Sequence, residues 1–494
     1  MTEISNFAGI LLVVTAGFAL AVLSTKLTER VPLPAPALFL LGAAAVSDLW
    51  PGVYAAVPVR TVERIAVVAL IVILFNGGIE IGWRRFRASL APILSLGVLG
   101  TFATAALVTL VARYGLGLRW ILAGIVGAAV APTDPAVMFS VLGRREIGGR
   151  SGTTLEGEAG VNDPAGIALM LGMIELATHA DASFWVVVRE FAIAMSIGGA
   201  LGLLGALVLI PLLRTLRLPS ESLFPVLALV LAGALYAATS VAHGSGFLAV
   251  FIAGLFLGDA RMPYKGEIER FSSALAGLAE LVVFVALGLT INIGGFSGRV
   301  WLDGVVLAVA LAFALRPLVV LVTLVRSRLS RAERVFIAWS GLKGAVPILL
   351  AAFAVLGGVA GARHVYGVVF VVVLVSVVGQ GTLVPLVAGM LAIPVRDRPA
   401  LPWELSVRLG QEPPAAHEFV VRAGSPAAGR AIRELPLGEH DWITLVVRDG
   451  IATRPCGSLE LQPGDRVLLL AEESDLEPLT RLFTAAEEQP PQRT

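Results

Sequence analysis

Long apolar segments recur along the first four-fifths of the chain, and this feature most restricts the fold. A helix that crosses a bilayer requires about 20 predominantly apolar residues. We expect thirteen spans, at 7–25, 33–50, 62–81, 90–112, 119–142, 153–178, 183–213, 222–242, 246–258, 272–292, 301–325, 334–357 and 363–391. The pattern predicts an all-α polytopic membrane protein with about 13 transmembrane helices.

Composition supports this class and excludes others. Only 15% of the residues are charged, against about 25% in soluble domains. The net charge of +1 argues against a nucleic-acid partner, since no basic excess is present to neutralise phosphates. With one cysteine and five histidines, we expect no disulfide and no transition-metal site. The first apolar run lacks a basic leader, so we expect a retained span.

The loops between the expected spans indicate an orientation. An odd number of spans places the two termini on opposite sides of the membrane. Lys and Arg gather in alternate loops, as at 84–87 and 326–334, and such loops favour the cytoplasmic side. We therefore expect a multi-pass protein of the cell (inner) membrane, with its N-terminus outside and its C-terminus in the cytoplasm.

The composition changes after residue 393, where charged and proline-rich sequence begins. The expected domains are a transmembrane domain at 1–393, a linker at 394–416, a small cytoplasmic α/β domain at 417–486 and a tail at 487–494. Within the small domain, the pattern predicts strands at 418–422, 442–447 and 466–470, with helices near 427–434 and 474–484.

Two expected spans are interrupted in their middles. Span 119–142 contains Ala131–Pro135 with two prolines, and span 334–357 contains Gly341–Pro347 with a lysine. Free backbone groups at membrane depth persist only inside protein or beside water. These are spans five and twelve, which correspond in an inverted 6+1+6 repeat, and paired breaks of this kind are typical of a transporter's binding site. Two ordinary proline kinks are the alternative.

Charged residues stand at or near these breaks. Asp134 and Lys343 could compensate the partial charges of the opposed half-helix ends. In span 153–178, Glu158 and Asn162 share one helix face, and Asp163 shares a face with Glu156.

Arg316 in span 301–325 requires an acidic partner at membrane depth. Glu158 is the preferred partner, with Glu156 as the alternative. Asp163 and Asp134 then remain as the carboxylates that bind ions.

These carboxylates suggest a chemistry. Burial favours the protonated form of a carboxylate, and the same group can bind a small cation that prefers oxygen ligands. Thr133 and Asn162 could supply further oxygens. Competition of a proton and a cation for one carboxylate is sufficient for antiport, and it requires no catalytic residue and no cofactor. Asn76, Glu156 and Glu280 are possible accessory groups, and a packing or structural role is the alternative for Asn76 and Glu280.

The motifs together resemble those of the cation:proton antiporter superfamily, NhaP-type branch. The resemblance covers about residues 5–393 and rests on Ala131–Pro135, Glu158–Pro164, Arg316 and Gly341–Ala345, in the family's order. It implies a homodimer.

The resemblance also implies residue roles. Asp163, Asp134 and Thr133 would serve the ion site, and Glu158 would pair with Arg316. The asparagine before Asp163 resembles the electroneutral type, so we expect one cation for each proton.

This sequence departs from the family pattern at three places. Ala159 replaces a serine, Asn76 stands where relatives often have an acid, and Lys343 replaces an arginine. Fewer hard oxygen ligands favour a larger and less hydrated ion, hence potassium over sodium.

The end of the chain resembles a TrkA-C (RCK-C) regulatory domain, through Ser425–Leu435 and Leu459–Val467. Antiporters with this domain are often potassium/proton exchangers, which also favours potassium. The domain would bind a small-molecule ligand or dimerise and so regulate the membrane part, and passive assembly is the alternative. The expected function is exchange of K⁺ for H⁺. The alternatives are Na⁺/H⁺ antiport, a cation channel gated by the C-terminal domain and, last, a membrane-embedded enzyme.

Overall fold

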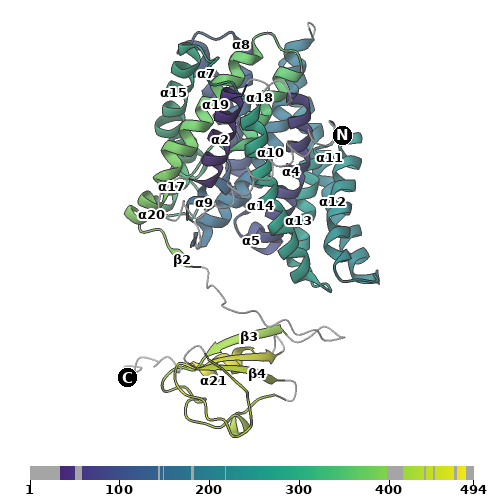
Figure 1. Cartoon of the computed structure of the whole chain (residues 1–494), viewed down its shortest axis with the longest axis vertical. Coiled ribbons are helices and arrows are strands. Elements are labelled where there is room, and N and C mark those ends of the chain that lie inside the picture. Colours follow the sequence, from purple (N-terminus) through teal and green to yellow (C-terminus); the bar gives the residue numbers. More distant parts are fainter. Residues whose placement is uncertain are drawn as a thin grey trace, which may run out of the picture. The chain divides into compact units, whose positions relative to one another are not determined.

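The computed structural model describes residues 34–50, 58–142, 145–147, 149–179, 183–216, 218–397, 415–438, 441–448, 451–471 and 476–484. The expected span 7–25, residues 398–414 of the expected linker and the tail 487–494 lie outside these residues. The chain divides into two compact units, Met1–Pro399 and Ala400–Thr494 (Figure 1).

The first unit is built from helices, several of which contain π-helical segments, here called η1, η2 and η3. Its helices are α2 (Ala35–Leu49), α4 (Val59–Ile81), α5 (Trp83–Ala88), α6 (Leu90–Leu94), η1 (Ser95–Gly100), α7 (Thr101–Tyr114), α8 (Trp120–Val130), α9 (Pro135–Leu142), α10 (Gly149–Thr178), α11 (Phe184–Thr215), α12 (Leu223–Val241), α13 (Gly246–Asp259), α14 (Lys265–Leu289), α15 (Gly298–Ala310), η2 (Leu311–Leu315), α16 (Arg316–Thr323), α17 (Arg331–Trp339), α18 (Ala345–Leu356), α19 (Ala362–Leu374), η3 (Val375–Gly381) and α20 (Val384–Met390). Strand β1 (Arg145–Ile147) pairs with β2 (Val395–Asp397) in antiparallel fashion.

Seven continuous helical stretches in the described part of the chain are long and apolar enough to cross a membrane. They are Val59–Ile81, Leu90–Tyr114, Phe184–Thr215, Leu223–Val241, Lys265–Leu289, Gly298–Thr323 and Ala362–Gly381. The shorter apolar helices include α8 and α18, because each is one half of an interrupted span. The unit is therefore a mostly helical, multi-pass membrane protein.

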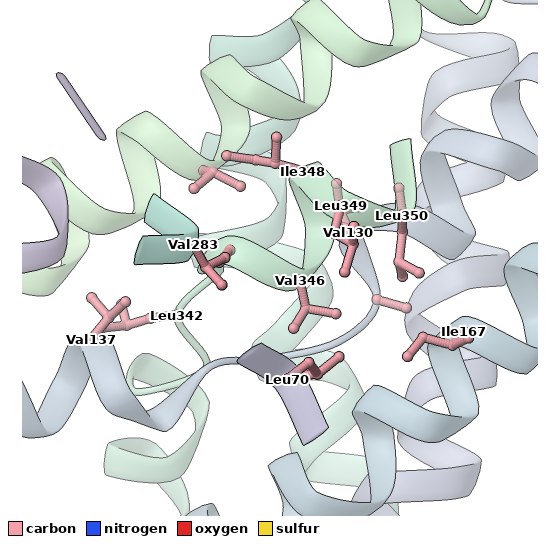
Figure 2. Packing of buried hydrophobic residues seen from close by; sticks show 14 of the residues in the cluster. Leu70, Val130, Val137, Ile167, Val283, Leu342, Val346, Ile348, Leu349 and Leu350 are labelled. Carbon is pink, nitrogen blue, oxygen red and sulfur yellow. The ribbon is translucent and has the colours of Figure 1, made fainter. Parts of the chain in front are cut away.

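The helices expose large apolar side chains and approach one another through glycines, as expected in a lipid bilayer. Large apolar side chains such as Leu207 on α11 and Val230 on α12 are exposed, as expected where a helix faces lipid. Helices α4 and α13 approach closely through glycines, because a Cβ on Gly78 would lie 2.5 Å from the carbonyl oxygen of Phe251. Around the two interrupted spans, Val130, Leu342 and their neighbours form part of one buried apolar cluster (Figure 2).

The second unit contains a four-stranded antiparallel sheet of order β3-β6-β4-β5. Its elements are β3 (Ala415–Val420), η4 (a 3₁₀ turn, Ile432–Glu434), β4 (Trp442–Arg448), β5 (Ile451–Thr453), β6 (Arg466–Ala471) and α21 (Leu476–Phe483). Val467 and Leu469 of β6 and Phe483 of α21 are fully buried in the apolar core of this unit.

The helix expected near 427–434 is wrong for most of its length, since only η4 is helical there. The N–H groups of Gly429 and Ile432 instead donate to the carbonyls of Leu461 and Leu459, and Leu461 N–H donates to Arg430. The segment is therefore held by backbone hydrogen bonds to residues 459–461 rather than by the hydrogen bonds of a helix. The sequence pattern also missed the short strand β5.

Candidate cation-binding site

The two interrupted spans meet at their breaks. Helix α8 ends at Val130 and α9 begins at Pro135, while α17 ends at Trp339 and α18 begins at Ala345. Pro135 suits the first position of a helix, because proline has no N–H to leave unpaired there.

Backbone groups join the two breaks directly. The N–H of Asp134 donates to the carbonyl of Leu342 at 2.8 Å. Part of the backbone freed by one break is therefore satisfied by the other break, as membrane depth requires.

Lys343 compensates the end of α8. Its Nζ donates to the carbonyls of Ala131 and Pro132 at 3.0 and 2.9 Å, and its side chain is buried. Carbonyls at a helix C-terminus lack partners within the helix and carry a partial negative charge. The positively charged side chain of Lys343, from the second interrupted span, thus lies at the C-terminal end of α8 in the first.

Asp134 lies at the beginning of α18. A Cβ built on Gly344, the residue that precedes α18, would overlap the Asp134 carboxylate. A carboxylate is favoured at a helix N-terminus, where N–H groups carry partial positive charge. Each break therefore supplies the charged side chain that stabilises a helix end of the other break: Lys343 at the end of α8 and Asp134 at the beginning of α18.

Helix α10 brings a second carboxylate and an amide to this region. Asn162 Nδ2 donates to Thr133 Oγ1 at 2.7 Å, which connects α10 to the first break. Asp163 is buried, and its Oδ1 and the Oδ1 of Asn162 have no hydrogen-bond partner among the described residues. Buried oxygens without donors are costly, so these two oxygens are candidate ligands for a water or a cation.

Arg316 and Glu158 form a buried ion pair. Arg316 donates from Nη1 to Glu158 Oε1 at 2.6 Å and from Nη2 to Oε2 at 2.8 Å. Both side chains are at most 4% exposed. Glu156 lies elsewhere, with its carboxylate 4.0 Å from Arg85. The Arg316 guanidinium therefore contacts Glu158 and not Glu156.

A cavity of about 40 Å³ lies beside the crossing. About 10–15 Å³ of such space holds one water, so the cavity has room for a cation with part of its hydration shell. Its lining consists of Ala66, Leu70, Ile73, Asp134, Asp163, Glu280, Val283, Phe284, Ala345, Val346 and Leu349. Asp134, Asp163 and Glu280 thus lie around one space, whereas Thr133 and Asn162 are not among its lining residues.

Asn76 is not on this lining. Its Nδ2 donates to Glu80 Oε1 at 2.9 Å, one turn along α4, and its Oδ1 has no described partner. Of the accessory residues expected from the sequence, Glu280 lines the cavity, and Asn76 and Glu156 do not.

Sequence reasoning missed two polar residues that hold the second break in place. The N–H of Lys343 donates to Ser376 Oγ at 3.0 Å, and Ser376 Oγ donates to Gln380 Oε1 at 3.3 Å. Gln380 Nε2 donates to the carbonyl of Trp339, the last residue of α17. The signal was available, because a serine and a glutamine four residues apart interrupt the apolar span 363–391.

The fold and the site define a membrane-embedded secondary transporter rather than an enzyme. Residues 7–389 match the family described as sodium/hydrogen exchanger, transmembrane, and residues 416–484 match the TrkA-C domain. The chain therefore belongs to the sodium/hydrogen exchanger family and carries a C-terminal TrkA-C domain.

Curated relatives match along almost the whole chain. The "K(+)/H(+) antiporter NhaP" of Alkalimonas amylolytica is 32% identical over 96% of this chain and 83% of the relative. The "K(+)/H(+) antiporter NhaP2" of Shewanella sp. (strain ANA-3) is 32% identical over 95% of this chain and 82% of the relative.

A solved structure has the same fold. The sodium proton antiporter MjNhaP1 from Methanocaldococcus jannaschii matches with a TM-score of 0.66 at 23% identity, over 78% of this chain and 98% of that chain.

Proposed function

We propose that the chain exchanges K⁺ for H⁺ across the membrane by electroneutral one-to-one antiport. The observation that carries the proposal is the buried Asp163 carboxylate, which lines a cavity at the crossing of two interrupted helices and keeps one oxygen without a donor. A carboxylate in such a place binds a proton or an alkali cation, and one excludes the other.

The neighbouring groups have distinct roles in this mechanism. Asp134 lies across the same cavity and supplies a second carboxylate. Asn162 and Thr133 contribute oxygen ligands, and their mutual hydrogen bond leaves the Asn162 carbonyl free to accept a cation. Transport results when the cavity opens alternately to the two sides with either the proton or the cation bound.

Two groups hold the site without exchanging ions. Lys343 neutralises the end of α8, and the Glu158–Arg316 pair fixes α10 against α16. Asn76 and Glu156 are accessory groups outside the cavity lining. Asn76 donates to Glu80, and the Glu156 carboxylate lies 4.0 Å from Arg85.

The relatives favour potassium as the cation, since those 32% identical are named K(+)/H(+) antiporters. Sodium is the second candidate, because a protein of Aphanothece halophytica that is 28% identical over 68% of this chain is named a Na(+)/H(+) antiporter.

The proposal includes an architecture of 13 transmembrane helices in an inverted 6+1+6 repeat, assembled as a homodimer. Its domains are 1–393, a linker at 394–416, a regulatory domain at 417–486 that binds a small ligand, and a tail at 487–494. The N-terminus is outside and the C-terminus is cytoplasmic. Cys456 tests this orientation, because it is the single cysteine and is exposed. A membrane-impermeant maleimide should label it in inverted vesicles and spare it in intact cells, and the opposite result would reverse the orientation.

Proteoliposomes with an internal pH-sensitive dye test the function. Added K⁺ should move protons out of vesicles that contain the parent protein, and Asp163→Asn should abolish this exchange. Glu175→Gln is a matched control near the end of the same helix, α10, and should behave as the parent does. An imposed membrane potential should leave the rate of electroneutral exchange unchanged.

Three results would change the proposal. A response to Na⁺ alone would replace potassium with sodium. Cation flux without proton movement would favour the channel gated by the C-terminal domain. Exchange by Asp163→Asn at the parent's rate would overturn the carboxylate mechanism.

A further inference from the structure

Helix α14 places a carboxylate on the wall of the cavity that faces Asp134 and Asp163. Glu280, Val283 and Phe284 follow the spacing of one helix face, and all three line the cavity. The side chain of Glu280 is therefore directed toward the space that the other two carboxylates share.

Among the described residues, one carboxylate oxygen of this glutamate lacks a structural partner. Its Oε1 is buried and has no hydrogen-bond partner among the described residues. Of the residues that the structure describes, the buried basic side chains are engaged elsewhere, Lys343 with the carbonyls at the end of α8 and Arg316 with Glu158. The other acids of α14 differ, because Glu267 and Glu269 form exposed pairs in its first turns with Arg270 and Lys265.

The rest of the lining is apolar. Leu70 of α4, Val283 of α14, and Val346 and Leu349 of α18 contribute to it, and all four belong to the buried cluster drawn in Figure 2. The three carboxylates are the charged groups of this lining. Acidic groups around one small space repel each other when ionised, and a cation among them removes that repulsion. Their oxygens are the hard ligands that alkali cations prefer.

We propose that Glu280 binds the transported alkali cation from the α14 side of the cavity, as a third carboxylate beside Asp163 and Asp134. This inference rests on the proposed function, which makes the cavity the transport site. It adds that the bound cation connects α14 to α10 and to the first break. Glu280 then sets the affinity for the cation, whereas Asp163 is essential for exchange.

The unmutated protein provides the first test. The full chain in detergent is treated with a fluorescent carbodiimide, which reacts with carboxyl groups in apolar surroundings, in KCl or in choline chloride. Adducts at Glu280 and Asp163 are quantified by peptide mass spectrometry. We expect adducts at both residues in choline and a parallel decrease of both as K⁺ is added.

The outcomes separate this inference from the proposed function. Protection of Asp163 without protection of Glu280, or no adduct at Glu280, overturns the inference and leaves the function intact. Protection of neither residue by K⁺ or Na⁺ overturns both.

Variants give the second test, in the proteoliposome assay. Glu280→Gln should raise the half-saturating K⁺ concentration about tenfold, equivalent to a tenfold weaker binding constant, with a smaller change in maximal rate. Glu280→Asp keeps the charge and should recover part of the affinity. Glu269→Gln, on the exposed part of the same helix, should match the parent. If Glu280 had only a structural role, Glu280→Gln and Glu280→Asp would lose transport activity equally. The protein that remained folded would then keep the K⁺ affinity of the parent.

Discussion

The N–H of Asp134 donates to the carbonyl of Leu342 at 2.8 Å, so the two interrupted spans are joined backbone to backbone. This single bond fixes the register of the crossing. Lys343, the next residue after Leu342, reaches the carbonyls of Ala131 and Pro132, and Gly344 lies against the Asp134 carboxylate. The crossing is therefore built by Ala131–Asp134 of one break against Leu342–Gly344 of the other, and it should be sensitive to small changes in either.

Lys343→Met should destabilise the protein and reduce transport. The substitution leaves the carbonyls of Ala131 and Pro132 without a donor in a buried place, at a cost of about 1–3 kcal/mol for each. Lys343→Arg retains a cation with several donors and should preserve most of the activity. Thermal unfolding in detergent and proton exchange in proteoliposomes measure both effects. Equal unfolding temperatures for Lys343→Met and the parent would contradict the assigned role.

Gly344→Ala should abolish exchange, because the added methyl group would occupy the position of the Asp134 carboxylate. The carboxylate must then move away from the beginning of α18 and from the cavity. Gly277→Ala is the matched control, since a Cβ at this position of α14 has no atom within 4 Å. It should be neutral or slightly stabilising, by up to about 1 kcal/mol. Similar transport by the two variants would show that the Asp134 position is not critical.

Loss of one partner of the Glu158–Arg316 pair should lower the free energy of unfolding by about 3–5 kcal/mol, because the remaining charge is buried without compensation. Glu158→Ala and Arg316→Ala should each have this effect, and the double variant should be less affected than the sum. The pair of Arg85 and Glu156 is 4.0 Å apart, with side chains 58% and 27% exposed, and should contribute at most about 1 kcal/mol. A double-mutant cycle for each pair, measured by thermal unfolding, tests the contrast, and equal coupling energies would refute it.

Much of the membrane unit could be predicted, because lipid makes hydrophobic length and buried charge strongly informative. The membrane class and the family were confirmed by the comparisons. The positions of both breaks follow from proline and glycine in otherwise apolar runs. Within the described residues, Arg316 meets an acid of α10 because a membrane offers a buried arginine few alternatives.

Other features depend on contacts that no local pattern encodes. The charge compensation between the breaks requires Asp134 to lie beside Gly344. These two residues are too far apart in sequence for helix or strand periodicity to predict the contact. Ser376 and Gln380 hydrogen-bond to backbone groups of Lys343 and Trp339, which are distant in sequence. Two polar residues in an apolar span indicate buried hydrogen bonds, but they do not identify these partners. In the second unit, the pairing of Gly429 with Leu461 overrode a pattern that is compatible with a helix.

Asp465 should make the C-terminal domain sensitive to acid. Its buried carboxylate accepts from Nε and Nη2 of Arg448 and from Gln462 N–H, each at 2.8 Å. The hydrogen bond from Arg448, above all, lowers the pKa of Asp465 below its ordinary value near 3.8. A carboxyl with a lowered native pKa stabilises the fold above its unfolded pKa, and this contribution is lost as the pH falls through the native pKa.

Hydrogen exchange of the β4 and β6 amides in the full chain, corrected for the intrinsic rate at each pH, measures this contribution. In the parent, protection should decrease as the pH falls from about 5 toward 3 and below, the range in which a carboxylate with a lowered pKa becomes protonated. In Asp465→Asn, these amides should be less protected at neutral pH. They should also lose less protection on acidification, because the variant lacks the titrating carboxyl group. Glu477→Gln removes an exposed pair with Arg481 and should follow the parent at every pH. If Asp465→Asn retained the acid profile of the parent, another carboxylate would be responsible for it.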